Sequence, residues 1–387
     1  MSSQPPPPGS RSDLLEVALL FFRLGSTGFG GPAAHIAMME DEVVRRRGWV
    51  TRQHFLDLLG ATNLIPGPSS TEMAIHLGYH RAGWTGLAVA GLCFIVPASA
   101  ITMALAWAYV RYGALPQTAG LLYGIKPVII AIVVQALFGL GRAAIKSPAL
   151  AMLAAAVALA NWLGISEIGA LLSAGVAAVT SMAMRQRLAL AMVTLLSASP
   201  PAGAAIATSP TVPFSLAALF WFFLKVGTVL YGSGYVLLAF LQGDLVVERG
   251  WMTEAQLLDA VAVGQVTPGP VFTTATFIGY FLGGVPGGVL ATLGIFLPSF
   301  LLVAASGPLV PRIRRSAAAR AFLDGVNAGA LALMAVVTFT LARAAIVDLT
   351  TLVVALASAV LLLRYRVSSL WLTVAGAALG LASGWAT

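Results

Sequence analysis

Charged residues are scarce in this 387-residue chain: they make up 9% of it, whereas 59% of the residues are hydrophobic. Soluble domains carry roughly a quarter of charged residues, so this chain could not cover a water-facing surface. The single cysteine, Cys93, cannot form an internal disulfide. A soluble enzyme, a secreted disulfide domain and a disordered protein are therefore excluded. The long apolar stretches predict an all-α, polytopic (multi-pass) membrane protein whose outward side chains meet the lipid bilayer.

Two further readings of the charges are excluded. The net charge of +8 does not indicate nucleic-acid binding, because the cations lie in short clusters between apolar runs, as loop charges do in membrane proteins. A cleavable signal segment is not expected either. Residues 1–12 are a Pro-rich polar tail, and the apolar run that follows contains Glu16 and Arg23.

The chain contains an internal repeat. Segments of the first half recur in the same order at an offset of 202, which becomes 201 after one deletion. The matched positions include Arg23 and Lys225, Arg47-Gly-Trp and Arg249-Gly-Trp, Asp57 and Asp259, Asn63 and Gln265, Pro66-Gly67-Pro68 and Pro268-Gly269-Pro270, and Gly124 and Gly325. We therefore predict a tail at 1–12, a first repeat at 13–187, a linker at 188–213 and a second repeat at 214–387.

Each half is expected to contain one broken helix among its membrane spans. A first apolar segment (14–38 or 216–242) precedes a segment that Pro-Gly-Pro interrupts at its centre (52–81 or 254–283), because proline cannot continue a helix. If the broken segments are re-entrant, the chain has about ten full spans. The spans that follow the breaks are predicted at 84–110, 118–145, 148–164 and 167–184, and at 285–309, 319–346, 348–363 and 367–385.

The arginines predict that the halves insert upside-down relative to each other. The loop after the first apolar segment is arginine-rich in the first half but not in the second. The loop after the span at 84–110 has Arg111 alone, whereas its second-half equivalent, after the span at 285–309, is arginine-rich. The two rich clusters are Arg45, Arg46, Arg47 and Arg52, and Arg312, Arg314, Arg315 and Arg320. Because cytoplasmic loops are enriched in Lys and Arg, both clusters are expected in the cytoplasm, which makes an inverted repeat.

Inverted repeats with broken helices are typical of transporters, whose substrate binds near the midplane where the breaks meet. With its helix starting near Leu14, Arg23 lies ~14 Å along it, close to the centre of a ~30 Å apolar layer, where a charge is costly. The predicted substrate-binding residues are Arg23, Lys225, Asn63, Gln265, Pro66, Gly67, Pro68, Ser69, Ser70, Pro268, Gly269, Pro270 and Thr273. The alternatives are proline kinks that serve packing, cations that snorkel, and an internal Glu16–Arg23 pair.

The half-helix after each break offers free N–H groups to an oxyanion. Ser69-Ser-Thr-Glu72 is also a capping-box pattern, in which Glu72 would compete with an anion for that end. The second-half sequence Val271-Phe-Thr-Thr274 has no acid and is the better anion site. The two halves are therefore expected to contribute unequally.

Glu72, His76 and His80 recur every four residues on one helical face. We expect proton handling by Glu72 and His76, and a membrane metalloenzyme that uses all three is the alternative from another class. The sequence between the histidines lacks the acid that zinc proteases use, so no metal, no cofactor and no enzyme activity are expected. The glycines between Gly25 and Gly31 indicate close helix packing, and those at Gly376 and Gly380 indicate packing within one chain or in a homodimer.

These motifs resemble the chromate ion transporter family in its long form with two halves. The resemblance rests on Phe22-Arg-Leu-Gly25, Gly30-Gly31-Pro32, Arg47-Gly-Trp49 and Asn63-Leu-Ile-Pro-Gly-Pro68. It implies a plasma (inner) membrane protein that exports chromate and confers resistance, with sulfate as a competing anion. The second copy departs at Tyr231-Gly-Ser-Gly234, where the first has Phe29-Gly-Gly-Pro32.

A dianion that leaves a cell with a negative interior gains roughly 4.6 kcal/mol per 100 mV, twice the value for one charge, so export needs little coupling. A sulfate-type uptake carrier is the alternative within transport. Chromate and sulfate are both tetrahedral dianions, so the residues alone do not separate them.

Overall fold

The computed structural model describes residues 10–113, 115–186, 213–231, 236–365 and 367–384, and these form helices without a strand. The first half contains α1 (Arg11–Thr27), α2 (Gly31–Glu40), η1 (Asp41–Arg46), α3 (Arg52–Thr62), α4 (Ser69–Tyr112), α5 (Pro116–Ala144), α6 (Pro148–Trp162) and α7 (Glu167–Gln186). The second contains α8 (Leu216–Val229), α9 (Leu237–Phe240), η3 (Leu241–Glu248), α10 (Glu254–Val266), η4 (Val271–Thr273), α11 (Thr274–Arg315), α12 (Ala317–Ala345), α13 (Leu349–Arg364) and α14 (Ser369–Gly384). Residues 1–9 of the predicted tail and most of the predicted linker lie outside the described residues, whereas Ser10 caps α1 and Arg11 and Ser12 belong to it.

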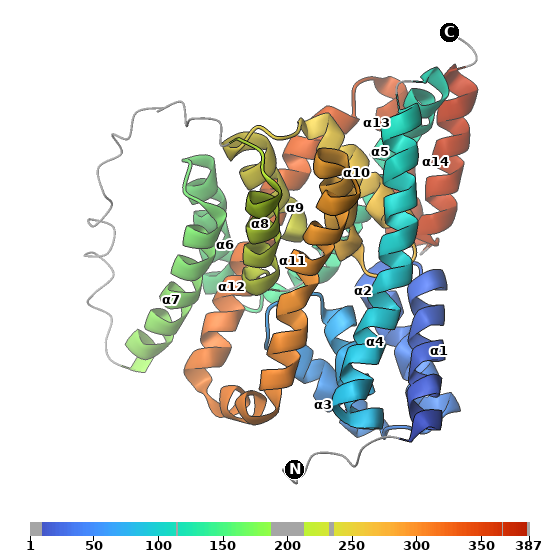
Figure 1. The fold of residues 1–387 in the computed structure, drawn as a ribbon. Coiled ribbons are helices and arrows are strands. Elements are labelled where there is room, and N and C mark those ends of the chain that lie inside the picture. Colours follow the sequence, from blue (N-terminus) through green and yellow to red (C-terminus); the bar gives the residue numbers. More distant parts are fainter. Residues whose placement is uncertain (1–9, 114, 187–212, 232–235, 366, 385–387) are drawn as a thin grey trace.

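The first helix of one half, α1, and its equivalent in the other half, α8, run in opposite directions. Figure 1 shows α1 beginning at the end of the bundle where the N-terminus lies, whereas α8 begins at the opposite end. The start of α3 and the turn between α11 and α12 lie at the end where α1 begins. These are the places of the two arginine-rich clusters. The arrangement is the one that an inverted repeat requires, and the side of the membrane that this end faces stays a prediction.

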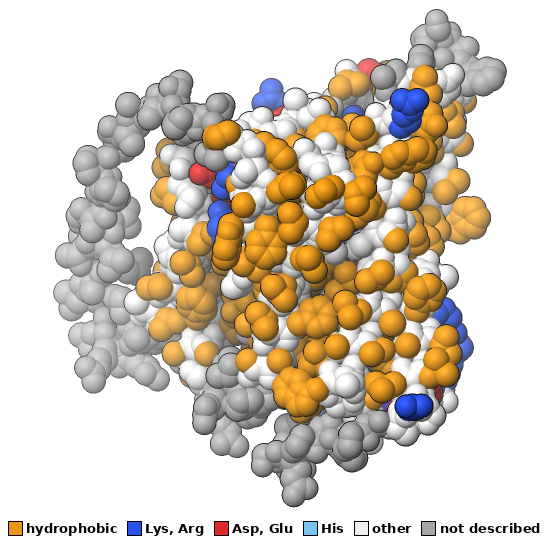
Figure 2. All heavy atoms as spheres, in the orientation of Figure 1, with side chains coloured by type: hydrophobic (Ala, Val, Ile, Leu, Met, Phe, Trp, Pro, Cys, Tyr) orange, Lys and Arg blue, Asp and Glu red, His pale blue; other side chains and the backbone are white. Residues whose placement is uncertain are grey.

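The apolar surface agrees with a membrane protein. Within the described residues, four helical segments are long and apolar enough to cross a bilayer: Ser69–Tyr112, Gln117–Ala144, Val271–Ser306 and Ala317–Ala345. Five shorter apolar helices accompany them in the described residues. The face in Figure 2 is covered by apolar side chains over most of its area. The described spans lie close to the predicted ones, while the number of full crossings stays a prediction.

Both predicted breaks are present. α3 ends at Thr62 and α4 begins at Ser69, so Pro-Gly-Pro falls between two helices; the same holds between α10 and η4. The helices after the breaks, α4 and α11, are each bent by two residues with non-helical backbone angles, Ala82–Gly83 and Gly283–Gly284. Each therefore has a short arm that leaves the break and a long arm that returns across the bundle.

The first apolar segment, expected as one run over 14–38, is divided in two. α1 ends at Thr27, Gly30 has a φ of 104°, and α2 starts at Gly31. Glycine tolerates the left-handed backbone that turns the chain here, and the following Pro32 is favoured in a first helical turn. Arg23 is consequently in the last turns of α1, close to a third break. The second-half equivalent, Gly232 to Gly234, lies outside the described residues.

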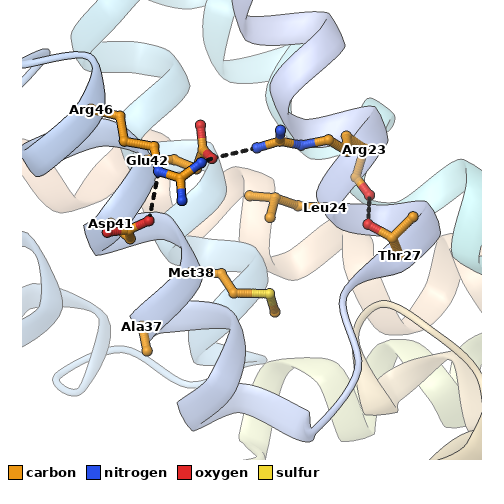
Figure 3. A pocket seen from close by; sticks show the side chains of 8 residues that line it. All are labelled: Arg23, Leu24, Thr27, Ala37, Met38, Asp41, Glu42 and Arg46. Carbon is orange, nitrogen blue, oxygen red and sulfur yellow. Dashed lines mark hydrogen bonds and ion pairs between the residues drawn. The ribbon is translucent and has the colours of Figure 1, made fainter.

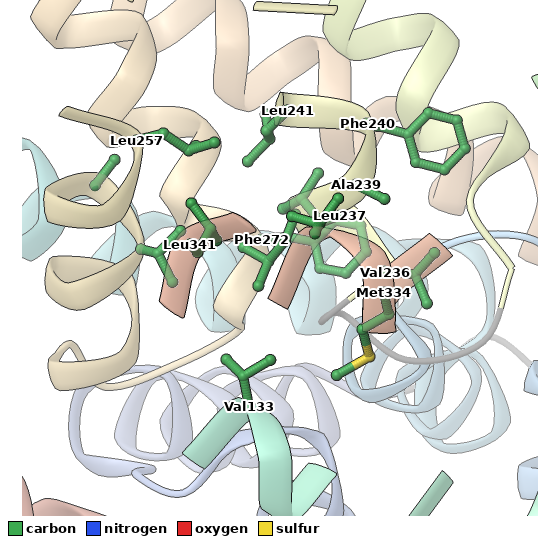
Figure 4. Close-up of a cluster of buried hydrophobic side chains, with 14 of the residues drawn as sticks. Val133, Val236, Leu237, Ala239, Phe240, Leu241, Leu257, Phe272, Met334 and Leu341 are labelled. Carbon is green, nitrogen blue, oxygen red and sulfur yellow. The ribbon is translucent and has the colours of Figure 1, made fainter. Parts of the chain in front are cut away.

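The halves are interlocked rather than side by side. α13 and α14 pack on α5 of the first half, while α6 and α7 pack on α12 of the second. Glycines allow the closest contacts: Gly124 and Gly120 lie against Gly376 and Gly380. The small-residue run in α14 therefore packs within the chain. The large core draws on both halves and includes Val133 of α5, Phe240 of α9, Leu257 of α10, Phe272 of η4 and Leu341 of α12 (Figure 4).

The prediction that the Gly25 region serves close packing is confirmed. A Cβ atom at Gly25 would collide with the backbone of Phe94 in α4, so α1 and α4 are in intimate contact. Gly227 of α8 has the same relation to the backbone of Ile295 in α11. The repeat thus preserves the packing of the first helix on the long arm.

Candidate functional site

The two Pro-Gly-Pro breaks cross over to the opposite half. The backbone N–H of Gly67 donates to the carbonyl oxygen of Leu230, just after α8, at 2.8 Å. The N–H of Gly269 donates to the carbonyl oxygen of Gly28, just after α1, at 2.7 Å. Gly28 and Leu230 are themselves equivalent at the offset of 202. Each break is therefore held by the end of the first helix of the other half.

Both crossings need a glycine. Gly67 has a φ of 135° and Gly269 a φ of 88°, angles that side chains rarely adopt. A Cβ atom at Gly67 would meet the carboxyl group of Glu72, and one at Gly269 would meet the side chain of Ala98. The prolines on both sides are buried as well. Irregular backbone inside a membrane protein is tolerated where protein surrounds it, as it does here.

The hydrogen bonds between each break and the opposite half determine which predicted residues can act together. Arg23 lies in the helix whose end holds the second-half break, about 7.5 Å along the axis from Gly28 at 1.5 Å per residue. Lys225 has the same relation to the first-half break. The predicted site residues are thus distributed over two sites, each built by both halves. We call the group of Arg23, Gly28 and Pro268–Pro270 the anion-side break, and the group of Lys225, Leu230 and Pro66–Pro68 the acid-side break.

The two predicted cations pair with carboxylates at equivalent positions. Arg23 Nη2 lies 2.6 Å from Glu42 Oε1, and Lys225 Nζ lies 3.0 Å from Asp244 Oδ2. The acids are nearly buried, with side chains 9% and 5% exposed, whereas Arg23 and Lys225 are 51% and 41% exposed. Glu42 and Asp244 share the offset of 202, so the ion pair is part of the repeat. The sequence contained this signal, but the acids were not predicted.

The alternative prediction of an internal Glu16–Arg23 ion pair is wrong, because each of these residues pairs with another side chain. Glu16 accepts from Arg47 Nη1 at 2.7 Å and from Arg81 Nη2 at 3.0 Å, because these arginines reach α1 from η1 and from the short arm of α4. Arg23 is bound to Glu42 instead, and Arg47 bridges the two acids through its Nε contact with Glu42 at 3.2 Å. The cations of this end form one network.

A pocket of about 530 Å³ opens beside Arg23 (Figure 3). Its polar lining comprises Arg23 and Thr27 of α1, with Asp41, Glu42 and Arg46 of η1. The described ion pair of Arg23 uses Nη2, and a guanidinium has five N–H donors, so other donors remain for an oxyanion. The two arginines of this pocket can bind a dianion if some of their ion pairs with the two acids are replaced by contacts with the anion.

The capping box predicted for Ser69 to Glu72 is wrong. Pro68 occupies the N-cap position of α4 and offers no side-chain hydrogen bond, so Ser69 is already inside the helix. Glu72 is fully buried and neither of its carboxyl oxygens has a hydrogen-bond partner. Its side chain lies against Gly67 rather than on the helix end. Ser70 is buried in the same turn.

The remaining predicted residues are arranged unequally. Thr273 is buried and its hydroxyl donates to the carbonyl oxygen of Pro270 at 2.9 Å, so it stabilises the break itself. Gln265 is half-buried and its buried side-chain nitrogen has no hydrogen-bond partner, which leaves it for a ligand. Its equivalent Asn63 is exposed at the end of α3. The amide at the second break is therefore the better candidate.

The histidines lie along the short arm of α4. His76 is 8% exposed, its Nε2 atom has no hydrogen-bond partner, and His80 is exposed. The ring of His54 in α3 lies 4.8 Å from that of His80. Among the described residues, no group of three or more His, Cys, Asp or Glu side chains is placed to hold a metal ion.

An intramembrane ion pair was not predicted. Lys126 Nζ in α5 lies 2.8 Å from Asp259 Oδ1 in α10, and the Tyr109 hydroxyl of α4 donates to Asp259 Oδ2 at 2.8 Å. It joins the two halves inside the apolar part of the bundle. The signal was available, since Lys126 lies inside the apolar span predicted at 118–145, whose other cation, Arg142, lies near its end, and charges within a span are functional candidates.

Two homologous helical halves with equivalent broken helices that contact each other are typical of membrane transporters. The model of the family described as "Chromate transporter" matches residues 15–180 and 217–381. The chain belongs to the chromate transporter family. The two matched regions correspond to the two repeats.

Relatives of similar length carry related names. The chain is 34% identical to a chromate transport protein of Cupriavidus metallidurans, over 95% of this chain and 92% of the relative. It is 32% identical to a chromate transport protein of Pseudomonas aeruginosa, over 87% and 82%. A probable chromate transport protein of Synechococcus elongatus is 31% identical, over 89% and 88%. No solved structure matches the chain.

Proposed function

We propose that this protein exports chromate from the cytoplasm across the plasma membrane, and that sulfate competes for the same site. Family membership supports chromate as the substrate, and the apolar bundle supports the multi-pass location. The observation that carries the assignment of the site is the anion-side break, where an acid-free helix start is held beside the helix that bears Arg23.

The anion-side break has the chemistry of an oxyanion site. The turn at Val271–Thr273 precedes α11, so the partial positive charge of a long helix lies at this end. No acid occurs from Pro268 to Thr276. Arg23 adds a charge whose planar fork fits two oxygens of a tetrahedral anion, and Gln265 adds an amide without a partner. A dehydrated dianion would find donors from both halves here.

Export is the direction that the membrane potential drives. A dianion gains roughly 4.6 kcal/mol per 100 mV on leaving a negative interior, twice the single-charge value. A carrier with alternating access therefore needs little or no energy source besides the potential. Uptake of the same dianion would require several co-transported cations.

The test is transport by the purified protein. Inside-out vesicles that contain the protein should accumulate labelled chromate when the lumen is made positive, and added sulfate should slow the uptake. Arg23→Gln should reduce this uptake, whereas Arg45→Gln, which removes an exposed arginine from the same charged segment, should not. Uptake that requires a lumen-negative potential, or that Arg23→Gln leaves unchanged, would contradict the proposal.

A further inference from the structure

Glu72 is the most isolated carboxyl group among the described residues. It is 0% exposed, both of its oxygens lack a hydrogen-bond partner, and no described lysine or arginine forms an ion pair with it. An ionised carboxylate without partners is extremely costly to bury, so such groups take up a proton instead. An uncharged Glu72 therefore suits the enclosed conformation described here, whereas an ionised Glu72 requires a conformation in which water or hydroxyl groups reach the carboxylate.

The surroundings of Glu72 are nevertheless polar. Ser299 of α11 and Thr71 of α4 have buried hydroxyl oxygens without partners, and a Cβ atom at Gly67 would touch both Ser299 and the Glu72 carboxyl group. Tyr231, after α8, is within electrostatic reach of Glu72. The titratable neighbours from the packed elements are thus Tyr231 and His76. Hydroxyl groups that can turn toward a carboxylate allow the acid to lose its proton when the site opens.

Three histidines lie between the position of Glu72 and the surface. His76 follows one turn later on α4 and is nearly buried, and His54 of α3 is within its electrostatic reach. His54 contacts the exposed His80, one further turn along α4. Exposure therefore increases step by step from Glu72 to His80. Imidazole rings accept and release protons near neutral pH, so these histidines are a suitable route for a proton.

The second half has no such arrangement. Thr274 aligns with Glu72, and Gln256 aligns with His54. His76 aligns with Ile278 at the offset of 202 and with Phe277 at the offset of 201, and both are apolar. The crossing of the breaks nevertheless makes the two sites equivalent in backbone geometry. One site of a symmetric pair therefore carries an acid and histidines, and the other carries neither.

We propose that the acid-side break is a proton-binding site and that protonation of Glu72 and anion binding at the anion-side break favour each other. The inference rests on the proposed oxyanion site. A dianion and an ionised Glu72 would repel each other through the low-dielectric interior, whereas a protonated Glu72 would not. In this step one proton moves from water, by way of the histidines, to a carboxylate oxygen of Glu72, and no other bond changes. Each dianion therefore binds together with a proton.

The experiment measures chromate binding to the full-length protein in detergent by calorimetry. Buffers with different ionisation enthalpies give the number of protons taken up on binding. Between about pH 7.5 and 9, where chromate is a dianion, the wild-type affinity should fall as the pH rises, by up to tenfold per pH unit for one linked proton. Glu72→Gln, which keeps the size of the neutral acid, should bind chromate with no pH dependence and no proton uptake. Glu254→Gln, at the accessible start of α10, should behave as the wild type.

The outcomes separate this inference from the proposed function. Wild-type binding without proton uptake, or a Glu72→Gln variant that keeps the wild-type pH dependence, would overturn the proton site and leave the anion site standing. Complete absence of anion binding by the wild type would overturn both. The wild-type measurement needs no variant, so it decides the matter even if Glu72→Gln does not fold.

Discussion

Removal of Lys225 should destabilise the fold much more than removal of its repeat partner Arg23. Without Arg23, Glu42 keeps Arg47 at 3.2 Å and Arg46 at 3.3 Å. The lost contact is then one of three ion pairs at Glu42, and it is made by a half-exposed arginine. Such a contact is worth roughly 0.5–1 kcal/mol.

The carboxylate of Asp244 has less support. Without Lys225 its described ion pairing is reduced to Arg249 at 3.9 Å, while the acids Glu167 and Glu248 remain within electrostatic reach. Removing one partner of a buried pair costs 3–5 kcal/mol. Because Lys225 is 41% exposed, we expect about 2–3 kcal/mol for Lys225→Gln, between the surface and buried values.

The assay is thermal unfolding of the purified protein in detergent, with the midpoint compared among variants. Lys225→Gln should lower the midpoint at least twice as much as Arg23→Gln. The double variant Lys225→Gln/Asp244→Asn should recover most of the loss, because it also removes the unpaired charge. Equal effects of the two single variants, or no recovery in the double variant, would refute the reasoning.

Three further predictions concern topology, binding and the crossed break. In a background without Cys93, Gly48→Cys and Ser316→Cys should react with a membrane-impermeant reagent from the cytoplasmic side; labelling from opposite sides would exclude the inverted repeat. Arg23→Gln should weaken anion binding about ten- to a hundred-fold, the worth of a charge-assisted hydrogen bond, and Arg23→Lys should weaken it less; unchanged calorimetric affinity would place the anion elsewhere. Gly67→Ala should abolish vesicle transport because the added Cβ meets Glu72, whereas Gly48→Ala, with open space around it, should cost only about 1 kcal/mol of backbone strain and retain transport.

The positions of the broken helices could be predicted because their causes are local. Proline cannot continue a helix, so the residues Pro66 to Pro68 were sufficient to place the break between α3 and α4. The break after Thr27 was not predicted, because the Gly25–Gly31 run was interpreted as a packing surface alone. It is both: Gly25 packs on Phe94, and Gly30 turns the chain.

The contacts between the two halves could not be predicted from the sequence. The offset of 202 shows that Gly28 and Leu230 are equivalent, but not that each accepts a hydrogen bond from the break of the other half. Such pairing depends on how the halves dock. The capping box failed for a local reason, since Pro68 already holds the N-cap position that Ser69 was expected to take.

The interlocked packing has a consequence for how the protein is made. Gly120 and Gly124 of α5 are synthesised early, yet the residues that cover them, Gly376 and Gly380, lie in the last helix. One face of α5 therefore stays uncovered in the bilayer until α14 has been synthesised. Truncation of α14 should therefore destabilise the first half. Two separately translated halves should resist proteolysis only when both are made in the same cell.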